Sequence, residues 1–400
     1  MPLFEYEAKT IQGRLIKGKM EAVSKHDLSA LLREKGYFPT RITQKSGILN
    51  SNIEMMQKVT TKDIAIFCKQ FSVIISAGVP ILRALEIVKR QTENKKLQKV
   101  LSDVVEDVKK GTTLSFSMKK NKDFPDMLSN MIAVGEASGT LDVILARMAV
   151  FYEKETDLNR KIKSATTYPV VICVVAIVVV IFLVTKIVPI FSNMLTSSGG
   201  TLPLPTKILM DISHFINTQW YILVIVTALL FILVKIYIKS TSGRFTVDHM
   251  KLNLPLFGKL YRKLVTARFA RTFGTLISSG IPVLSSIDIC SNVIGNVVVQ
   301  NTLTSTQEEI KKGLGLGETL ETTDIFPPML TQMIMIGEEA GTLDEVLEST
   351  AGFYDKEVDA ATEQMTNLIQ PIILVVLGVV IAYIIISILL PMMDLYSTIA

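Results

Sequence analysis

The sequence predicts an all-α integral membrane protein with two homologous cytoplasmic six-helix bundles, three transmembrane helices and a small N-terminal ββα(β) module. Of the 400 residues, 49% are hydrophobic and the mean hydropathy is +0.41, which is too apolar for a chain that is soluble throughout. Three apolar windows approach the ~20 residues that a helix needs to cross a bilayer. One long segment also occurs twice at a fixed offset, which indicates an internal duplication.

The three predicted spans are residues 169–190, 219–238 and 371–393. The first two contain one lysine each, Lys186 and Lys235. Both lysines lie near a span end, where the ammonium group can reach the interface. The third span contains no charged residue. The charged residues therefore do not exclude any of the three windows as a transmembrane span.

Basic residues near the spans predict the orientation, because Lys and Arg accumulate on the cytoplasmic side. Four precede the first span and three follow the second, whereas only Lys207 lies between them. The N-terminus lacks the apolar core of a secretory signal. We therefore expect a multi-pass protein of the cytoplasmic (inner) membrane with a cytoplasmic N-terminus, a short external loop at 191–218 and an external C-terminal tail at 394–400.

The duplication has an offset of 202 residues, and 124–145 and 326–347 are identical at 13 of 22 positions without a gap. One unit is a helical bundle followed directly by a span, so we place the bundles at 60–168 and 262–370. The segments 46–59 and 239–261 are expected to be linkers. The second span has no counterpart at the offset. It acts as a return helix, and both bundles then face the same compartment.

Residues 1–45 follow a different pattern. Apolar and polar residues alternate from Phe4 and again from Arg14, with a turn at Gln12-Gly13, which is typical of a β-hairpin. A helix is expected from Ser24, its N-cap, to Gly36, which stops it. The segment predicts the ββα(β) module.

Two glycine-containing segments superficially match phosphate-binding motifs. Residues 13–20 fit the P-loop pattern except at Met20, where a hydroxyl should contact magnesium, and the hairpin context offers no helix N-terminus. The run from Gly313 to Gly317 lies between helices with no strand before it. The three histidines are scattered, and no nucleophile elbow is present. The sequence therefore predicts no catalytic residue and no cofactor. Interspersed charges argue against nucleic-acid binding.

The sharpest motif is duplicated, as GEASGTLD at 135 and GEEAGTLD at 337. Its glycine is expected to end one helix at positive φ, its threonine to cap the next, and its aspartate to lie in that helix's first turn. The glutamate lies in the last turn, where an anion is disfavoured by about 0.3–1 kcal/mol. It therefore either caps the next helix's free N–H groups or holds a cation or a basic partner. The residues concerned are Glu136, Gly139, Thr140 and Asp142 in the first copy and Glu338, Gly341, Thr342 and Asp344 in the second.

The four acidic residues of this motif are weak candidate metal ligands. The sequence does not predict a metal site from them. Candidate partner-binding residues are the same four together with Glu155 and Glu357 of the duplicated FYxKE segment. Other duplicated residues have expected structural roles. Gly78 and Gly280 should stop a helix and Pro80 and Pro282 start the next. Pro169 and Pro371 suit a first helical turn, and Pro189 and Pro391 the outer span ends.

These motifs identify a family. The N-terminal FEYEA with Gly13 and Gly18, the paired GVP and GIP segments, both GExxGTLD motifs and the Lys161-to-Pro169 segment resemble the inner-membrane platform proteins of type IV pili and type II secretion, the PilC/GspF family. The resemblance covers essentially the whole chain. Thr166, where the family has an aliphatic residue, and Gln370, the counterpart of Tyr168, depart from its pattern at the start of the spans.

The resemblance implies a non-enzymatic role. The chain would be the platform of a type IV pilus machine and couple a cytoplasmic hexameric assembly ATPase to the insertion of pilin subunits into the fibre. The implied partners are this ATPase, pilins or pseudopilins, other inner-membrane assembly proteins, and further copies of the chain in a dimer or tetramer. A type II secretion or competence pseudopilus platform is the first alternative. A repeat-built transporter is the second, although the spans contain no acidic residue or histidine.

Overall fold

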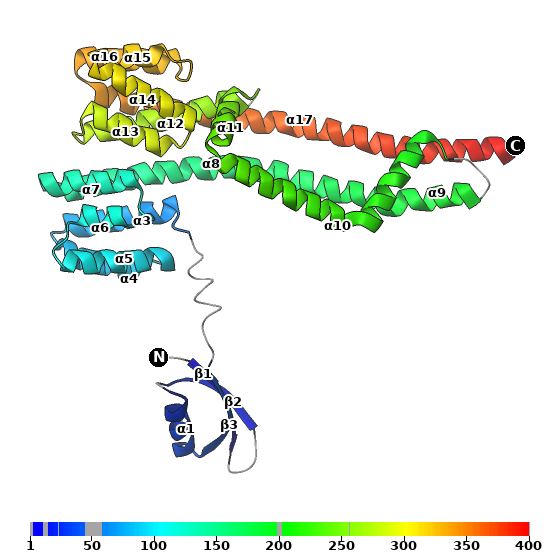
Figure 1. Cartoon of the computed structure of the whole chain (residues 1–400), viewed down its shortest axis with the longest axis horizontal. Helices are drawn as coiled ribbons and strands as arrows, with labels where there is room; N and C mark the ends of the chain where they lie inside the picture. Colours follow the sequence, from blue (N-terminus) through cyan, green and yellow to red (C-terminus); the bar gives the residue numbers. More distant parts are fainter. Residues whose placement is uncertain are drawn as a thin grey trace. The chain divides into compact units, whose positions relative to one another are not determined.

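The computed structural model describes residues 3–10, 15–22, 24–44, 58–197, 202–255 and 257–399. The chain forms two compact units, residues 1–123 and 124–400 (Figure 1). Helices dominate both, and three of them are long and apolar enough to cross a membrane. The predicted all-α membrane fold with a small N-terminal module is confirmed.

The N-terminal module is a three-stranded antiparallel sheet with one helix. Its elements are β1 (Leu3–Thr10), β2 (Leu15–Glu21), α1 (Lys25–Glu34) and β3 (Tyr37–Gln44). The strand order is β2-β1-β3, so the strand after the helix pairs with β1 and completes the predicted ββα(β) pattern. Phe4, Tyr6 and Ala8 project from alternate positions of β1 and pack with Leu28 and Leu32 of α1.

The described part of the first unit contains four more helices, and their sequences contain the signals that delimit them. They are α3 (Thr61–Ser76), α4 (Ile81–Gln91), α5 (Lys95–Lys109) and α6 (Leu114–Lys120). Thr60 and Asp63 form a capping box at the start of α3. Gly78 follows this helix at φ +79°, and Pro80 is the N-cap residue of α4. The predicted stop and start are confirmed here and at Gly280 and Pro282.

The second unit contains the rest of the duplicated region. Its elements are α7 (Asp126–Ser138), α8 (Leu141–Phe182), a π-helical turn η1 (Leu183–Ile187), α9 (Val188–Ser197), α10 (Leu204–Lys239), α11 (Thr241–Asn253), α12 (Phe257–Ser278), α13 (Val283–Ile294), α14 (Val297–Lys311), α15 (Leu316–Glu321), α16 (Pro328–Ala340) and α17 (Leu343–Ile399). The helices α4 to α8 start 202 residues before α13 to α17, one for one. Each repeat therefore supplies six helices in the same order.

The prediction that Pro169 and Pro371 lie in the first turn of a helix is wrong. Both lie inside α8 and α17, which run from the bundle into the apolar span without a break (Figure 1). No glycine stop precedes either proline, so the helix continues through it. The hydroxyls of Thr166 and Thr167 donate to the Lys163 carbonyl oxygen at 2.9 and 2.8 Å. The carbonyl oxygen that Pro169 leaves without its N–H partner is that of Ala165, so these two bonds do not compensate for the proline.

Pro189 and Pro391 do not end helices either. Pro189 lies in α9 directly after η1, and the wider π turn accommodates a residue that cannot donate an N–H. Pro391 lies inside α17, which continues to Ile399 through the segment expected as a tail. The helices therefore extend beyond both predicted outer boundaries.

The segments expected as a loop and a linker are largely helical. Within 191–218 the described residues belong mostly to α9 and α10, and α10 bends at Gln219, where the second span was predicted to begin. Within 239–261, α11 packs against α12 and α14. Buried Asp248 of α11 accepts a hydrogen bond from the Val297 N–H at 3.1 Å and so caps α14. This second segment is therefore a packed part of the second bundle.

The outer parts of the long helices pack together. Val184, Val188, Leu209 and Ile384 form a buried cluster from η1, α9, α10 and α17. Thr206 of α10 donates a hydrogen bond to the Ser387 carbonyl oxygen of α17. Apolar packing and a polar contact together join the three membrane helices, as is common between helices in lipid.

Candidate functional site

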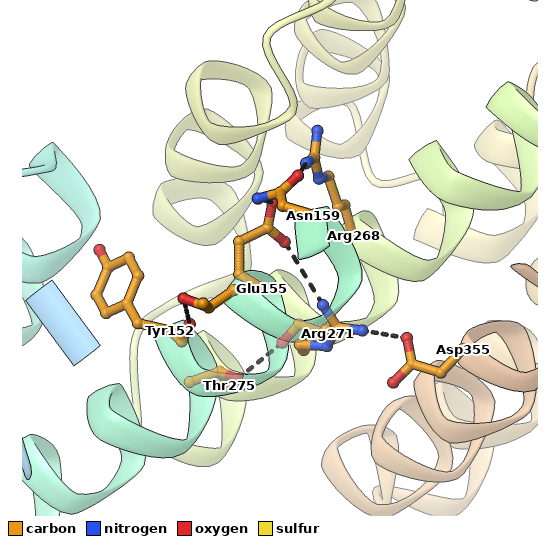
Figure 2. A network of polar contacts seen from close by, with 8 residues as sticks. Tyr152, Glu155, Asn159, Arg268, Arg271, Thr275 and Asp355 are labelled. Atoms are coloured by element: carbon orange, nitrogen blue, oxygen red, sulfur yellow. Dashed lines mark hydrogen bonds and ion pairs between the residues drawn. The ribbon is translucent and has the colours of Figure 1, made fainter. Parts of the chain in front are cut away.

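The strongest cluster of charged residues lies where the two repeats meet. Helix α8 of the first repeat passes α12 and α17 of the second, and Glu155 of α8 points toward α12 (Figure 2). Its two carboxylate oxygens lie 2.5 Å from Arg268 Nη2 and 3.6 Å from Arg271 Nη1. Arg271 also pairs with Asp355 of α17. One carboxylate therefore serves two arginines from the other repeat.

This cluster is largely removed from solvent. The side chains of Glu155, Arg268 and Arg271 are 16%, 22% and 10% exposed. Among the residues that the structure describes, the Nε of Arg268 and the Nη1 of Arg271 have no hydrogen-bond partner. Glu155 therefore supports the charge of Arg268 and shares that of Arg271 with Asp355, and its loss is costly because a buried charge needs a partner.

Asp355 has a different electrostatic balance. Burial raises the pKa of its carboxyl above the ordinary value, and this effect exceeds the opposing attraction of Arg271 and Lys154. The charged form is therefore disfavoured by the protein relative to water. The ion pair with Arg271 therefore does not fully offset the cost of burying Asp355.

A cleft of about 550 Å³ adjoins the cluster. Arg147 and Lys154 of α8 line one side and Glu345 and Glu348 of α17 the other, with small residues of α12 between them. Arg147 donates a hydrogen bond to the Ser279 hydroxyl at 3.0 Å. The arrangement is a junction between helices that is lined by charged side chains of both signs.

Two more ion pairs follow toward the membrane. Lys161 of α8 lies 2.6 Å from Asp359 of α17, and Lys263 of α12 lies 2.6 Å from Glu357 of α17. Both pairs are more exposed than the Glu155 cluster. The first joins α8 to α17 shortly before their apolar segments begin, so the two long helices are tied together at that level.

The structure gives the duplicated glutamate a role that differs from both predicted ones, which were to cap the following helix or to hold a cation or basic partner. Glu338 accepts hydrogen bonds from the backbone N–H groups of Leu316 and Gly317, each at 2.8 Å. It therefore caps a helix, but that helix is α15, which precedes it, and not α17, which follows. Gly317 permits this approach, since a Cβ there would lie 2.8 Å from the Met335 backbone nitrogen of α16. The same role for Glu136 stays a prediction from the repeat.

Replacing Glu338 by alanine is expected to lower the free energy of unfolding by about 1–2 kcal/mol, the usual cost of losing a cap. Glutamine keeps one acceptor oxygen and should cost less. The measurement is thermal unfolding of the purified chain, with the neighbouring Glu339→Gln as a matched control. Unchanged stability together with lost assembly would instead favour the cation or partner contact.

Other motif residues have clear structural places. Gly139 and Gly341 end α7 and α16 at φ +73° and +69°, as predicted. Thr140 precedes α8, but its side chain makes no cap hydrogen bond, so the predicted capping is wrong. Its hydroxyl lies 2.7 Å from the Ser138 hydroxyl instead. The first glycine of each motif allows close packing, because a Cβ on Gly135 would lie 3.2 Å from the Leu141 Cα.

The acidic candidates are not assembled into a metal site. Asp142 and Asp344 lie in the first turns of α8 and α17, as predicted, and Asp344 lines the cleft. No group of three or more His, Cys, Asp or Glu side chains that could hold a metal occurs in the part of the chain that the structure describes. A metal-binding role for Glu136, Asp142, Glu338 and Asp344 therefore stays a hypothesis from the sequence.

Sequence reasoning selected Glu155 but missed the two arginines it serves. A signal was available. At the repeat offset, Arg268 and Arg271 replace Ile66 and Lys69 of the first copy, on a helix whose buried phenylalanines are unchanged. Two arginines at i and i+3 that the first copy lacks, on a helix that is otherwise similar in both copies, indicate an anionic neighbour that only the second copy has.

Comparison with known proteins now decides the family. The family model described as "Type II secretion system (T2SS), protein F" matches residues 67–189 and again 269–391, and the model of that protein's N-terminal domain matches 1–43. The chain belongs to the type II secretion system protein F family. The two matched segments differ by the offset of 202 residues, so the family unit is the repeat itself.

Relatives of two kinds align along the entire chain of this family member. The type IV pilus assembly protein PilC of Thermus thermophilus is 38% identical, with all of both chains covered. PilC of Myxococcus xanthus is 36% identical over 99% of this chain and 95% of its own. Type II secretion system protein F of Pseudomonas aeruginosa is 32% identical, with 99% of both chains covered. The resemblance to the pilus and secretion platform family is confirmed.

Proposed function

We propose that this chain is the inner-membrane platform of a type IV pilus assembly machine, which couples a cytoplasmic hexameric ATPase to the insertion of pilin subunits. The observation that supports this proposal is the continuity of α8 and α17 from bundle to span. A continuous helix transmits displacement along its axis, whereas a flexible linker absorbs it. The Lys161–Asp359 pair and the Glu155 cluster join the two helices ahead of the membrane.

The type IV pilus is preferred over secretion because relatives that bear the pilus name match at 38% and 36%, against 32% for protein F. A type II secretion or competence pseudopilus platform is the alternative. Both assign the same non-enzymatic task to the chain. The partners in this proposal are the ATPase, pilins or pseudopilins, other inner-membrane assembly proteins and further copies of the chain.

Copurification from the native host tests this function. The tagged full-length chain should retain an assembly ATPase and pilin-like subunits after mild solubilisation. Reconstituted liposomes should show no solute flux above that of empty vesicles. Recovery of neither partner, together with measurable flux, would favour a transporter.

The orientation is a separate prediction. A reporter fused after Gly258 should be cytoplasmic, because the basic residues after α10 favour that side. A reporter fused after Leu202 should be external. The measurement is the activity of paired reporters that function on opposite sides of the membrane. An external signal after Gly258 would place the two bundles on different sides and contradict the platform.

A further inference from the structure

One contact between helices of the two repeats predicts, through the duplication, a contact between the homologous helices. Within the second unit, α8 of the first repeat covers the face of α12 that carries Arg268 and Arg271. The homologous helix of the first repeat is α3, and its corresponding face carries Ile66, Lys69 and Val73. That face is open: Ile66 is 44% exposed and Val73 66%.

The covering helix has a homologue as well, which is α17. Phe151 of α8 is only 5% exposed and lines the cleft toward α12, whereas its counterpart Phe353 of α17 is 42% exposed. Each phenylalanine makes the same edge-to-face contact with the tyrosine that follows it, with ring centroids 5.1 and 5.3 Å apart. The same residue in the same local geometry is thus covered in one repeat and open in the other.

The residues that differ between the repeats change together. Arg268 donates a hydrogen bond to Asn159 at 3.1 Å, and the counterparts of this polar pair are Ile66 and Ala361, which are both apolar. An isolated change of Arg268 to an apolar residue would leave an amide facing it. The paired change instead gives a matched apolar contact.

The charge pair is retained. The counterparts of Arg271 and Glu155 are Lys69 and Glu357, which again have opposite charge. Glu357 already pairs with Lys263, but its side chain is 37% exposed. Glu155 shows that a carboxylate at this position can serve two cations at once.

We propose that the face of α3 formed by Ile66, Lys69 and Val73 packs against the face of α17 formed by Phe353, Glu357 and Ala361 in a second copy of this chain. The contact repeats between copies what α12 and α8 form within one. The two faces differ, so the contact is heterologous. Each copy carries one face of each kind. This inference rests on the self-association included in the proposed function and assigns a surface to it.

Charge reversal tests the proposal in the full-length chain in detergent. Lys69→Glu and Glu357→Lys should each raise the dissociation constant of self-association by about tenfold or more, because like charges then face each other. A mixture of the two variants should regain wild-type association, since each contact in a mixed pair has opposite charges. The control is Lys99→Glu on α5, which should change nothing.

Crosslinking between differently tagged copies gives an independent measurement. One copy carries Ile66→Cys and the other Ala361→Cys, both with Cys173→Ser; burial raises the pKa of the thiols of Cys68 and Cys290, which keeps them unreactive toward maleimides. A short bismaleimide should link the two tags. Lys99→Cys in place of Ile66→Cys should give no product.

The outcomes separate the surface from self-association. Association that resists both charge reversals, or equal crosslinking from Lys99→Cys, would overturn the proposed surface and leave self-association standing. A monomeric wild-type chain would overturn both. Copurification of the ATPase and pilins would still support the platform function in either case.

Discussion

Replacing Glu155 by glutamine is expected to lower the free energy of unfolding by about 3–5 kcal/mol, the usual cost of breaking a buried ion pair from one side. The amide removes the negative charge that contacts Arg268 and Arg271, so Arg268 loses this ion pair and Arg271 keeps only its pair with Asp355. The expected measurement is a marked drop in the midpoint of thermal inactivation at one fixed heating rate.

The repeat supplies a matched control. Glu357 occupies the same position in the second copy, but its pair with Lys263 is about one-third exposed on each side. Glu357→Gln should therefore cost no more than about 1 kcal/mol, as surface pairs do. Equal losses from the two substitutions would show that the greater burial of Glu155 adds nothing to the stabilising effect of its ion pairs.

Asp355→Asn probes the other end of the same cluster. Because burial raises the pKa of Asp355, the folded protein binds that proton more tightly than the unfolded chain does. Its contribution to stability is therefore complete below the unfolded pKa and is lost as the pH rises through the folded one. At neutral pH the neutral asparagine should cost less than Glu155→Gln. A larger cost would mean that Arg271 depends chiefly on Asp355.

The local signals in the sequence predicted most of the fold. Capping residues, positive-φ glycines and the offset of 202 residues located the starts of the helices, because each acts within a few residues of where it stands. The prediction that the prolines start helices was wrong because their placement does not depend on local signals alone. Pro169 reads locally as a helix start, but its placement depends on whether the preceding turn continues into it, as it does in α8.

The site was less accessible from the sequence. Glu338 was identified as a group in need of a partner, yet its partner lies 22 residues earlier, and the approach depends on how α15 packs on α16. The Glu155 cluster joins residues more than 100 positions apart. Only the exchange of Ile66 and Lys69 for Arg268 and Arg271 between repeats pointed to it. Such contacts need the tertiary arrangement.

Inserting Gly-Ser-Gly after Lys163 is expected to abolish fibre assembly, down to the level of a strain without the protein. The insertion falls between the Lys161–Asp359 pair and Pro169, so the bundle contacts upstream stay intact while α8 loses its continuity. Glycine in a helix interior costs about 1 kcal/mol per residue and favours an unwound linker. Motion of the bundle would then no longer reach the span. The measurement is the number of surface fibres per cell.

The control inserts the same three residues between two helices, where the helical structure is already interrupted. Ser240 separates α10 from α11 in an extended conformation, with φ −69° and ψ +147°. An insertion after Ser240 should leave fibre assembly close to the wild-type level. Immunoblots of membranes establish that both variants accumulate equally. If the α8 insertion left assembly intact, α8 would not be the coupling element, and α17, which is continuous over 57 residues, would have to act alone.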